Sequence, residues 1–244
     1  MAPRKRGRVI SQVGTVYHDR DERRLVKLPG QVRDWQVKCV CGGTHLTCNG
    51  GWMRQIEEEA KPILVPLIQG KQKDLAASDQ IIIAIWAVLK AMVSEYHPTS
   101  KISTHWMQRR LIRNRGVPPT SGWSVWIASY ERKNWRPEWL SFPFFVPSNK
   151  VLKRRGKREP TYYNATSTTQ IIGKLFIQVV HLPVPFITGD VVRRRIFPST
   201  AGTIFRIWPD QLTTLHWPDR ALSDRDADKL AGAMQNFLRS ISKT

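Results

Sequence analysis

One segment that is apolar on nearly every side constrains the fold most. Residues 81–96 read IIIAIWAVLKAMVSEY and follow Ser78 and Asp79. Ser78 is a favourable N-cap and Asp79 suits the positive end of a helix dipole, so we predict a helix that begins here and ends at Pro98. Because this helix has almost no polar face, we predict that it is buried in the core.

A shorter helix is predicted on each side of the core helix. The first begins near Gly51 and ends at Pro62, because proline cannot continue a helix. The second has the sequence HWMQRRLIRNR, with an N-cap at Ser103 or Thr104 and an end at Gly116. The residues on the inward faces are predicted to be Trp52, Ile56 and Ala60 in the first helix, and Trp106 and Leu111 in the second.

After Pro118 the chain has the character of a β-sheet. Four segments are rich in β-branched and aromatic residues, and they read WSVWIAS, WLSFPFFV, TQIIGKLFIQVV and TIFRIWP. We predict antiparallel strands, with a strand entry at Thr166–Thr169 and a basic loop at KVLKRRGKREP. A C-terminal helix follows, capped by Ser223 with Asp226 three residues on. Its apolar stripe comprises Ala227, Leu230, Ala231, Met234, Phe237, Leu238 and Ile241.

The balance of charge indicates a polyanionic partner. The chain has 39 Lys and Arg against 19 Asp and Glu, a formal net charge of +20. A field of this sign attracts nucleic acid, although a basic surface can also serve solubility alone. We expect DNA as the partner. The basic residues that we expect to contact it are Arg109, Arg110 and Arg113 in the second short helix, and Lys153, Arg154, Arg155, Lys157 and Arg158 in the predicted loop.

The sequence gives no sign of a targeting or membrane segment. The start, MAPRKRGRVISQ, is basic but has no apolar run after it. The most apolar run, Ile81–Leu89, is interrupted by Lys90 and is far shorter than the ~20 residues of a membrane span. We therefore predict a cytoplasmic protein without membrane association. Cysteines stay reduced there, so a cysteine cluster is more typical of a metal site than of disulfides.

All three cysteines of the chain lie in the segment CVCGGTHLTCN. With one histidine they supply four candidate zinc ligands, namely Cys39, Cys41, His45 and Cys48. The C-x-C spacing differs from that of a zinc knuckle, and its two side chains point to opposite faces unless the segment turns. The following Gly-Gly pair permits such a turn. A structural zinc site and a set of structural thiols are both compatible with this pattern.

The cysteine segment and its continuation resemble a family of predicted HNH-type endonucleases. The family pattern is C-x2-C-N-x-G-W-M-x-x-L-E, sometimes with a Gly-Gly-x-His insertion between the cysteines. The segments AKPILVPLIQG, DQIIIAIWAVLKAMVSE and IFRIWPD…HWPDRALSDRDAD are also similar, so the resemblance covers most of the chain from about Cys41 onward. The motif is matched here by Cys41, Cys48, Asn49, Gly51, Trp52, Met53, Ile56 and Glu57.

This resemblance implies a ββα-metal site that cleaves DNA. In that design a His on a strand activates water, an Asn in a loop orients the His, and Mg²⁺ or another divalent metal stabilises charge on the phosphate. Asn49 matches the loop Asn, and Glu57 matches a helical Glu. His18, in VYHDRD on a predicted strand, is the remaining candidate for the catalytic His, and an ordinary polar residue is the alternative.

The chain departs from the family pattern near its start. It has no cysteine before Cys39 and no Glu-His or Asp-His pair, so the usual general base and the upstream cysteine pair of the zinc site are missing. A start codon assigned too late and a remnant without nuclease activity both explain this. We expect an inactive or truncated HNH-like DNA endonuclease that binds DNA electrostatically. The alternatives are a non-catalytic nucleic-acid-binding accessory or phage or mobile-element protein, and a structural component that contacts RNA.

Helices and strands in separate blocks predict an α+β fold. We expect a degenerate ββα-metal-like, zinc-type module in residues 1–62 and a helical segment in residues 63–116. An antiparallel β region with a C-terminal helix is expected in residues 117–244. The other histidines, His97, His105, His181 and His216, are interpreted as structural.

Overall fold

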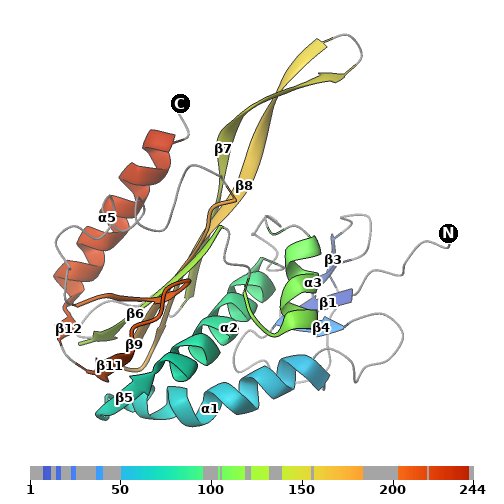
Figure 1. Ribbon diagram of the computed structural model, residues 1–244. Coiled ribbons are helices and arrows are strands. Elements are labelled where there is room, and N and C mark those ends of the chain that lie inside the picture. Colours follow the sequence, from blue (N-terminus) through green and yellow to red (C-terminus); the bar gives the residue numbers. More distant parts are fainter. Residues whose placement is uncertain are drawn as a thin grey trace.

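The structure is a computed structural model, and its description covers only part of the chain. The described ranges are 8–11, 15–17, 23–25, 37–40, 51–95, 104, 106–118, 122–131, 139–154, 157–183, 203–218 and 220–241. Helices and strands are mixed, so the predicted α+β class is confirmed (Figure 1). The helices are α1 (Met53–Gln69), α2 (Ala77–Ser94), α3 (Trp106–Arg115) and α5 (Asp224–Ile241).

The main sheet has the strand order β10-β6-β9-β8-β7. Neighbours along this path are antiparallel, and β12 pairs in parallel with β6. Two smaller sheets accompany it, β3-β2-β1-β4 near the N-terminus and the pair β11-β5. The strands of the main sheet are β6 (Trp123–Tyr130), β7 (Trp139–Arg154), β8 (Lys157–Ile172), β9 (Leu175–His181), β10 (Phe205–Trp208) and β12 (Ala221–Leu222). The remaining strands are β1 (Arg8–Ser11), β2 (Thr15–Tyr17), β3 (Arg23–Leu25), β4 (Val37–Val40), β5 (Lys73–Ala76) and β11 (Thr214–Trp217).

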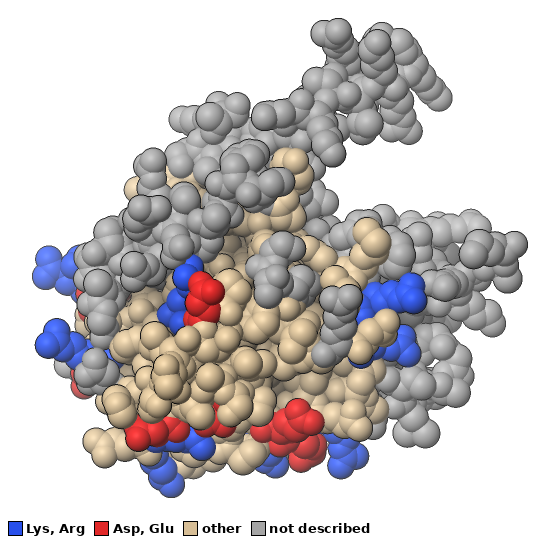
Figure 2. Space-filling model, in the orientation of Figure 1, with Lys and Arg blue, Asp and Glu red and all other residues tan. Residues whose placement is uncertain are grey.

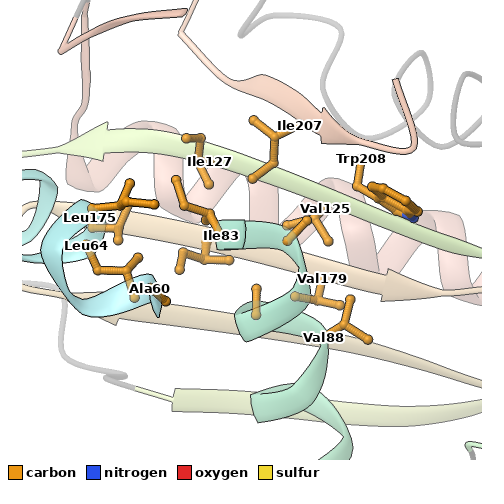
Figure 3. Packing of buried hydrophobic residues seen from close by; sticks show 14 of the residues in the cluster. Ala60, Leu64, Ile83, Val88, Val125, Ile127, Leu175, Val179, Ile207 and Trp208 are labelled. Carbon is orange, nitrogen blue, oxygen red and sulfur yellow. The ribbon is translucent and has the colours of Figure 1, made fainter. Parts of the chain in front are cut away.

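Helices cover the central strands of the main sheet on both faces (Figure 1). Every residue of β6 is buried, and alternate residues of a strand point to opposite faces. Val125 and Ile127 belong to the core that α1 and α2 form with the sheet, which Figure 3 shows. Trp126 and Ala128 belong to a second core against α5. The sheet therefore forms the middle layer between α1 and α2 on one side and α5 on the other.

Helix α2 is the predicted core helix, and its burial is confirmed. Ile83, Ala84 and Ala87 are fully buried between α1 and the sheet. In the described part of the chain, α2 is the one helix long and apolar enough to cross a membrane, yet more than half of it is buried inside the protein. The predicted N-cap at Ser78 is wrong by two residues, because the helix starts directly after β5. The N-cap is Ala76, and its backbone N–H donates to the carboxylate of Asp79 at 3.3 Å.

The prediction that α1 ends at Pro62 is wrong, because the helix continues through Pro62 and Pro66 to Gln69. The residues beyond the first proline that face inward, Ile63, Leu64 and Leu67, are buried against α2. Burial of these side chains offsets the backbone hydrogen bonds that the prolines remove. The helix ends at Gly70, whose left-handed φ of 72° suits a residue without a Cβ.

The segment TQIIGKLFIQVV, predicted as one strand, contains the end of β8, a two-residue turn and most of β9. Gly173 and Lys174 separate β8 from β9, and Gly173 has a φ of +55°. A Cβ on Gly173 would lie 2.4 Å from the Ile68 carbonyl oxygen, so only glycine fits where this turn meets the end of α1. The Lys174 backbone N–H donates to the same carbonyl at 2.8 Å and fixes the turn on α1.

Candidate functional site

The basic segment predicted as a loop belongs to the hairpin of β7 and β8, so that prediction is wrong. Lys153 lies opposite Arg158, and Arg154 lies opposite Lys157. Residues 155 and 156 connect the two strands. Both lie outside the described residues, so the predicted contact residue Arg155 is not described. The segment lacks β-branched and aromatic side chains near its centre, which favoured a loop. Long-range pairing along both 16-residue strands overrides that local preference.

The outer part of this hairpin leaves the sheet. β8 pairs with β9 only from Thr166 onward, where Thr166 lies opposite His181. Among the described strands, residues 157–165 pair only with β7, which makes a two-stranded ribbon that projects beyond the other described elements (Figure 1). β7 is an edge strand of the sheet, and it contains Pro143 and Pro147. The side chains near the tip are not described.

The predicted basic helix is confirmed as α3, and its arginines divide into two kinds. Arg110 and Arg113 are exposed, and no ion pair within the described residues involves them. Arg109 is half-buried, and its guanidinium forms an ion pair with Glu95. It also donates to the carbonyl oxygens of Met92 and Thr104, both at 3.3 Å. Arg109 thus holds α3 against α2, whereas Arg110 and Arg113 are available to a partner.

Glu95 is the centre of a buried polar cluster that the sequence analysis did not identify. Its side chain is 1% exposed. The Thr104 backbone N–H donates to both carboxylate oxygens at 3.1 and 3.2 Å, and the Thr104 hydroxyl donates at 2.6 Å. The Thr166 hydroxyl donates to the same carboxylate at 3.3 Å. With Arg109, these contacts join the end of α2, the start of α3 and the middle of β8. The prediction that Thr166 lies at a strand entry is therefore wrong, because β8 begins at Lys157.

His181 lies beside this cluster on the end of β9. It is 1% exposed, and its ring stacks on Trp123 with centroids 4.3 Å apart. Neither ring nitrogen has a hydrogen-bond partner in the described structure. Burial lowers the pKa of His181 from 6.5 to about 3, with a further contribution from the positive charge of Arg109. The imidazole is thus neutral at pH 7, and because it is sealed from solvent it cannot reach an external substrate.

The predicted metal and catalytic residues lie almost entirely outside the described residues. These are His18, Cys41, His45, Cys48 and Asn49. Only the backbone of Cys39 is described, in β4 opposite Val9. Among the side chains that are described, no three His, Cys, Asp or Glu residues are grouped closely enough to hold a metal ion. The zinc site and the ββα-metal module remain predictions.

Sequence reasoning missed the buried cluster because its members are distant in the chain. Glu95 and Thr166 are 71 positions apart. The one local signal is a carboxylate at the end of an otherwise apolar helix, because a buried acid requires donors. Comparison of the chain with protein-family models, with curated proteins and with solved structures finds no match.

Proposed function

We propose that this protein binds DNA through phosphate contacts, with little sequence preference. The observation that supports the proposal is the outward face of α3. Arg110 and Arg113 are exposed there, and the sequence of α3, WMQRRLIRNR, contains no acidic residue. A guanidinium matches the geometry of a phosphate group and stays charged at any physiological pH. Their separation by three positions puts both groups on one side of the helix.

The rest of the described surface is more balanced, which makes α3 distinct. Arg54 pairs with Glu58, Lys90 with Glu57, and Arg206 with Asp210. Figure 2 shows acidic and basic side chains mixed along the lower edge, where α1 lies in Figure 1. A surface with both signs interspersed gives little net attraction for a polyanion. The net charge of +20 therefore resides largely elsewhere in the chain.

A titration of DNA binding against salt tests this proposal. Each neutralised phosphate on a duplex lowers the slope of log K against log salt by about 0.9, so five to nine contacts predict a slope of roughly −4 to −8. Changing both Arg110 and Arg113 to Gln should flatten the slope by about two units. The matched control changes Arg54 and Arg206 to Gln, because both already pair with acids. No binding of wild type at low salt, near 50 mM, would contradict the proposal.

The resemblance to HNH-type endonucleases supports a more specific form of this proposal. In it, the protein is a degenerate endonuclease in which Asn49 and His18 are the catalytic candidates. Cys39, Cys41, His45 and Cys48 would hold a structural zinc ion, and Mg²⁺ would act in catalysis if any activity remains. Elemental analysis of the purified protein tests the zinc site directly. A non-catalytic accessory protein that binds nucleic acid is the alternative, and cleavage assays distinguish the two.

A further inference from the structure

We infer that the ribbon of β7 and β8 is a duplex-binding arm that enters the major groove of double-stranded nucleic acid. This inference rests on the proposed nucleic-acid binding and adds the element and the form of nucleic acid that it takes. We define the ribbon tip as residues 150–159. Its basic residues in the described strands are Lys150, Lys153, Arg154, Lys157 and Arg158, and Glu159 is the one acid in these strand segments.

The register puts basic residues on both faces of the ribbon. Lys153 and Arg158 occupy one pair of opposite positions, and Arg154 and Lys157 occupy the next pair. Residues directly opposite share a face, and successive pairs alternate between faces. Each face of the tip therefore has one like-charged pair. A groove surrounds an inserted ribbon with phosphates on two sides, and a ribbon that is basic on both faces matches that environment.

These like-charged pairs are unfavourable for the free protein. Equal charges directly opposite in an antiparallel ladder destabilise it, and a two-stranded hairpin is only marginally stable in water. On the tip side of Thr166, no third strand within the described residues pairs with the ribbon. Phosphate groups between and beside the cations would remove the repulsion. The arrangement is therefore better suited to a bound polyanion than to stability of the free hairpin.

The dimensions of the ribbon fit the major groove. Residues 157–165, at about 3.3 Å per residue, give a free arm of about 30 Å. The backbones of its two strands are about 5 Å apart, so the ribbon together with its side chains is considerably wider than 5 Å. The major groove is about 12 Å wide and admits a two-stranded β-ribbon, whereas the minor groove is about 6 Å wide.

The composition of the tip favours a duplex over a single strand. Proteins that hold single strands stack bases on aromatic side chains. Residues 150–159, KVLKRRGKRE, contain no aromatic residue. The tip thus offers charge without a stacking platform, and the aromatic residues of β8 in the arm, Tyr162 and Tyr163, lie closer to the sheet than the basic pairs. RNA duplexes are also disfavoured, because their deep, narrow major groove excludes such an element.

Two variants with equal loss of charge test the inference. The ribbon variant changes Lys153, Arg154, Lys157 and Arg158 to Gln. The body variant changes four exposed cations of the described surface to Gln, namely Lys61, Lys71, Lys174 and Arg220. Each protein is titrated with a DNA duplex of about 30 base pairs and with one of its single strands, over a range of salt. A third variant replaces residues 153–158 by Asn-Gly, a favoured two-residue hairpin turn.

We expect wild type to bind the duplex at least about fivefold more tightly than the single strand. The ribbon variant should flatten the duplex slope by about two to four units, while the body variant changes it by less than about one. Protection of guanine N7, an atom of the major groove, from dimethyl sulfate should disappear in both ribbon variants. Circular dichroism and thermal melting should show that the variants are folded.

The contrary outcomes separate the inference from the proposed function. If wild type binds the duplex, and the ribbon and body variants have equal slopes, the ribbon inference fails and the proposed function stands. Protection of adenine N3 in place of guanine N7 would assign the minor groove and overturn the inference. Absence of binding to either nucleic acid at low salt would remove both.

Discussion

At the residue scale, Glu95 connects three elements through one carboxylate. Its partners are Thr104, Arg109 and Thr166. Glu95→Gln keeps the shape but removes the charge, so it weakens every donated hydrogen bond and leaves Arg109 half-buried without its counterion. We expect a loss of about 2–4 kcal/mol in the free energy of unfolding, measured by urea denaturation.

A matched substitution on the surface controls for the loss of a carboxylate. Glu58 forms an ion pair with Arg54 at 3.7 Å, and both side chains are well exposed. Glu58→Gln should change stability by less than about 0.5 kcal/mol. Equal effects of the Glu58 and Glu95 substitutions would show that the buried cluster does not stabilise the fold.

The buried imidazole of His181 predicts a dependence of stability on pH. Its pKa is about 3 in the folded protein and 6.5 in the absence of burial, so the unfolded chain binds a proton first as the pH falls. Stability is therefore complete above about pH 6.5 and decreases steadily toward pH 3. His181→Phe keeps a ring beside Trp123 and removes the titrating group. Between pH 7 and pH 5, wild type should lose about 1–2 kcal/mol more than this variant. Identical losses of stability in wild type and the variant would show that burial does not lower the pKa of His181 in the folded protein.

At the element scale, the start of α5 depends on a reciprocal cap that the sequence predicted correctly. The Asp226 backbone N–H donates to the Ser223 hydroxyl at 3.3 Å, and the Ser223 backbone N–H donates to the Asp226 carboxylate at 3.1 Å. The Ser223 hydroxyl also donates to that carboxylate at 2.7 Å. This hydrogen bond is the main cause of a lowered pKa of Asp226. The cap therefore stabilises the fold while Asp226 is ionised, and the contribution is lost as the pH falls through its pKa.

Removing the hydroxyl of Ser223 tests the cap. Ser223→Ala should cost about 1 kcal/mol at pH 7, which denaturation measures, and should raise the pKa of Asp226 toward its ordinary value, which NMR titration of the carboxyl measures. Ser223→Thr keeps the hydroxyl and serves as the control. A pKa of Asp226 that is the same in the alanine variant as in wild type would contradict the assigned cause.

Local patterns predicted those elements whose own residues specify them. Helix α5 has its cap, and Ala227, Leu230 and Phe237 of its stripe are buried. Helix α3 is followed by Gly116, which has a φ of 64°. Local patterns failed where distant contacts override them. Pro62 marks a helix end by itself, but burial of Leu64 and Leu67 carries α1 past it. The ribbon tip, similarly, is a loop by composition and a pair of strands by register.

The candidate site was predictable to the same limited extent. The basic sequence of α3 identified Arg110 and Arg113, which are exposed as a nucleic-acid contact requires. It also suggested Arg109, because the three arginines look alike in sequence. Only the position of Glu95 distinguishes Arg109, and Glu95 comes from the end of another helix. A pattern of cations cannot reveal which of them has a buried acid as its partner.

At the scale of the whole molecule, the proposal of a degenerate HNH-like endonuclease that lacks the usual general base predicts little cleavage of DNA. Supercoiled plasmid incubated with the protein and Mg²⁺ or Mn²⁺ should remain largely intact, because loss of a general base typically costs 10²–10⁴-fold in rate. Agarose gels give the fraction nicked. Efficient nicking that disappears in a His18→Ala variant would assign catalysis to His18, and His216→Ala would control for loss of an exposed histidine.

The pairing of β5 with β11 determines when the protein can fold during its synthesis. Asp74 lies opposite His216, and β6 pairs with both β10 and β12. The core around α2 includes Ile207, Trp208, Leu215 and Trp217, all from the last quarter of the chain. A nascent chain from which residues 205–217 have not yet emerged thus leaves part of the apolar core around α2 uncovered. The core around α2 is consequently completed only when β5 pairs with β11, a strand that is synthesised much later.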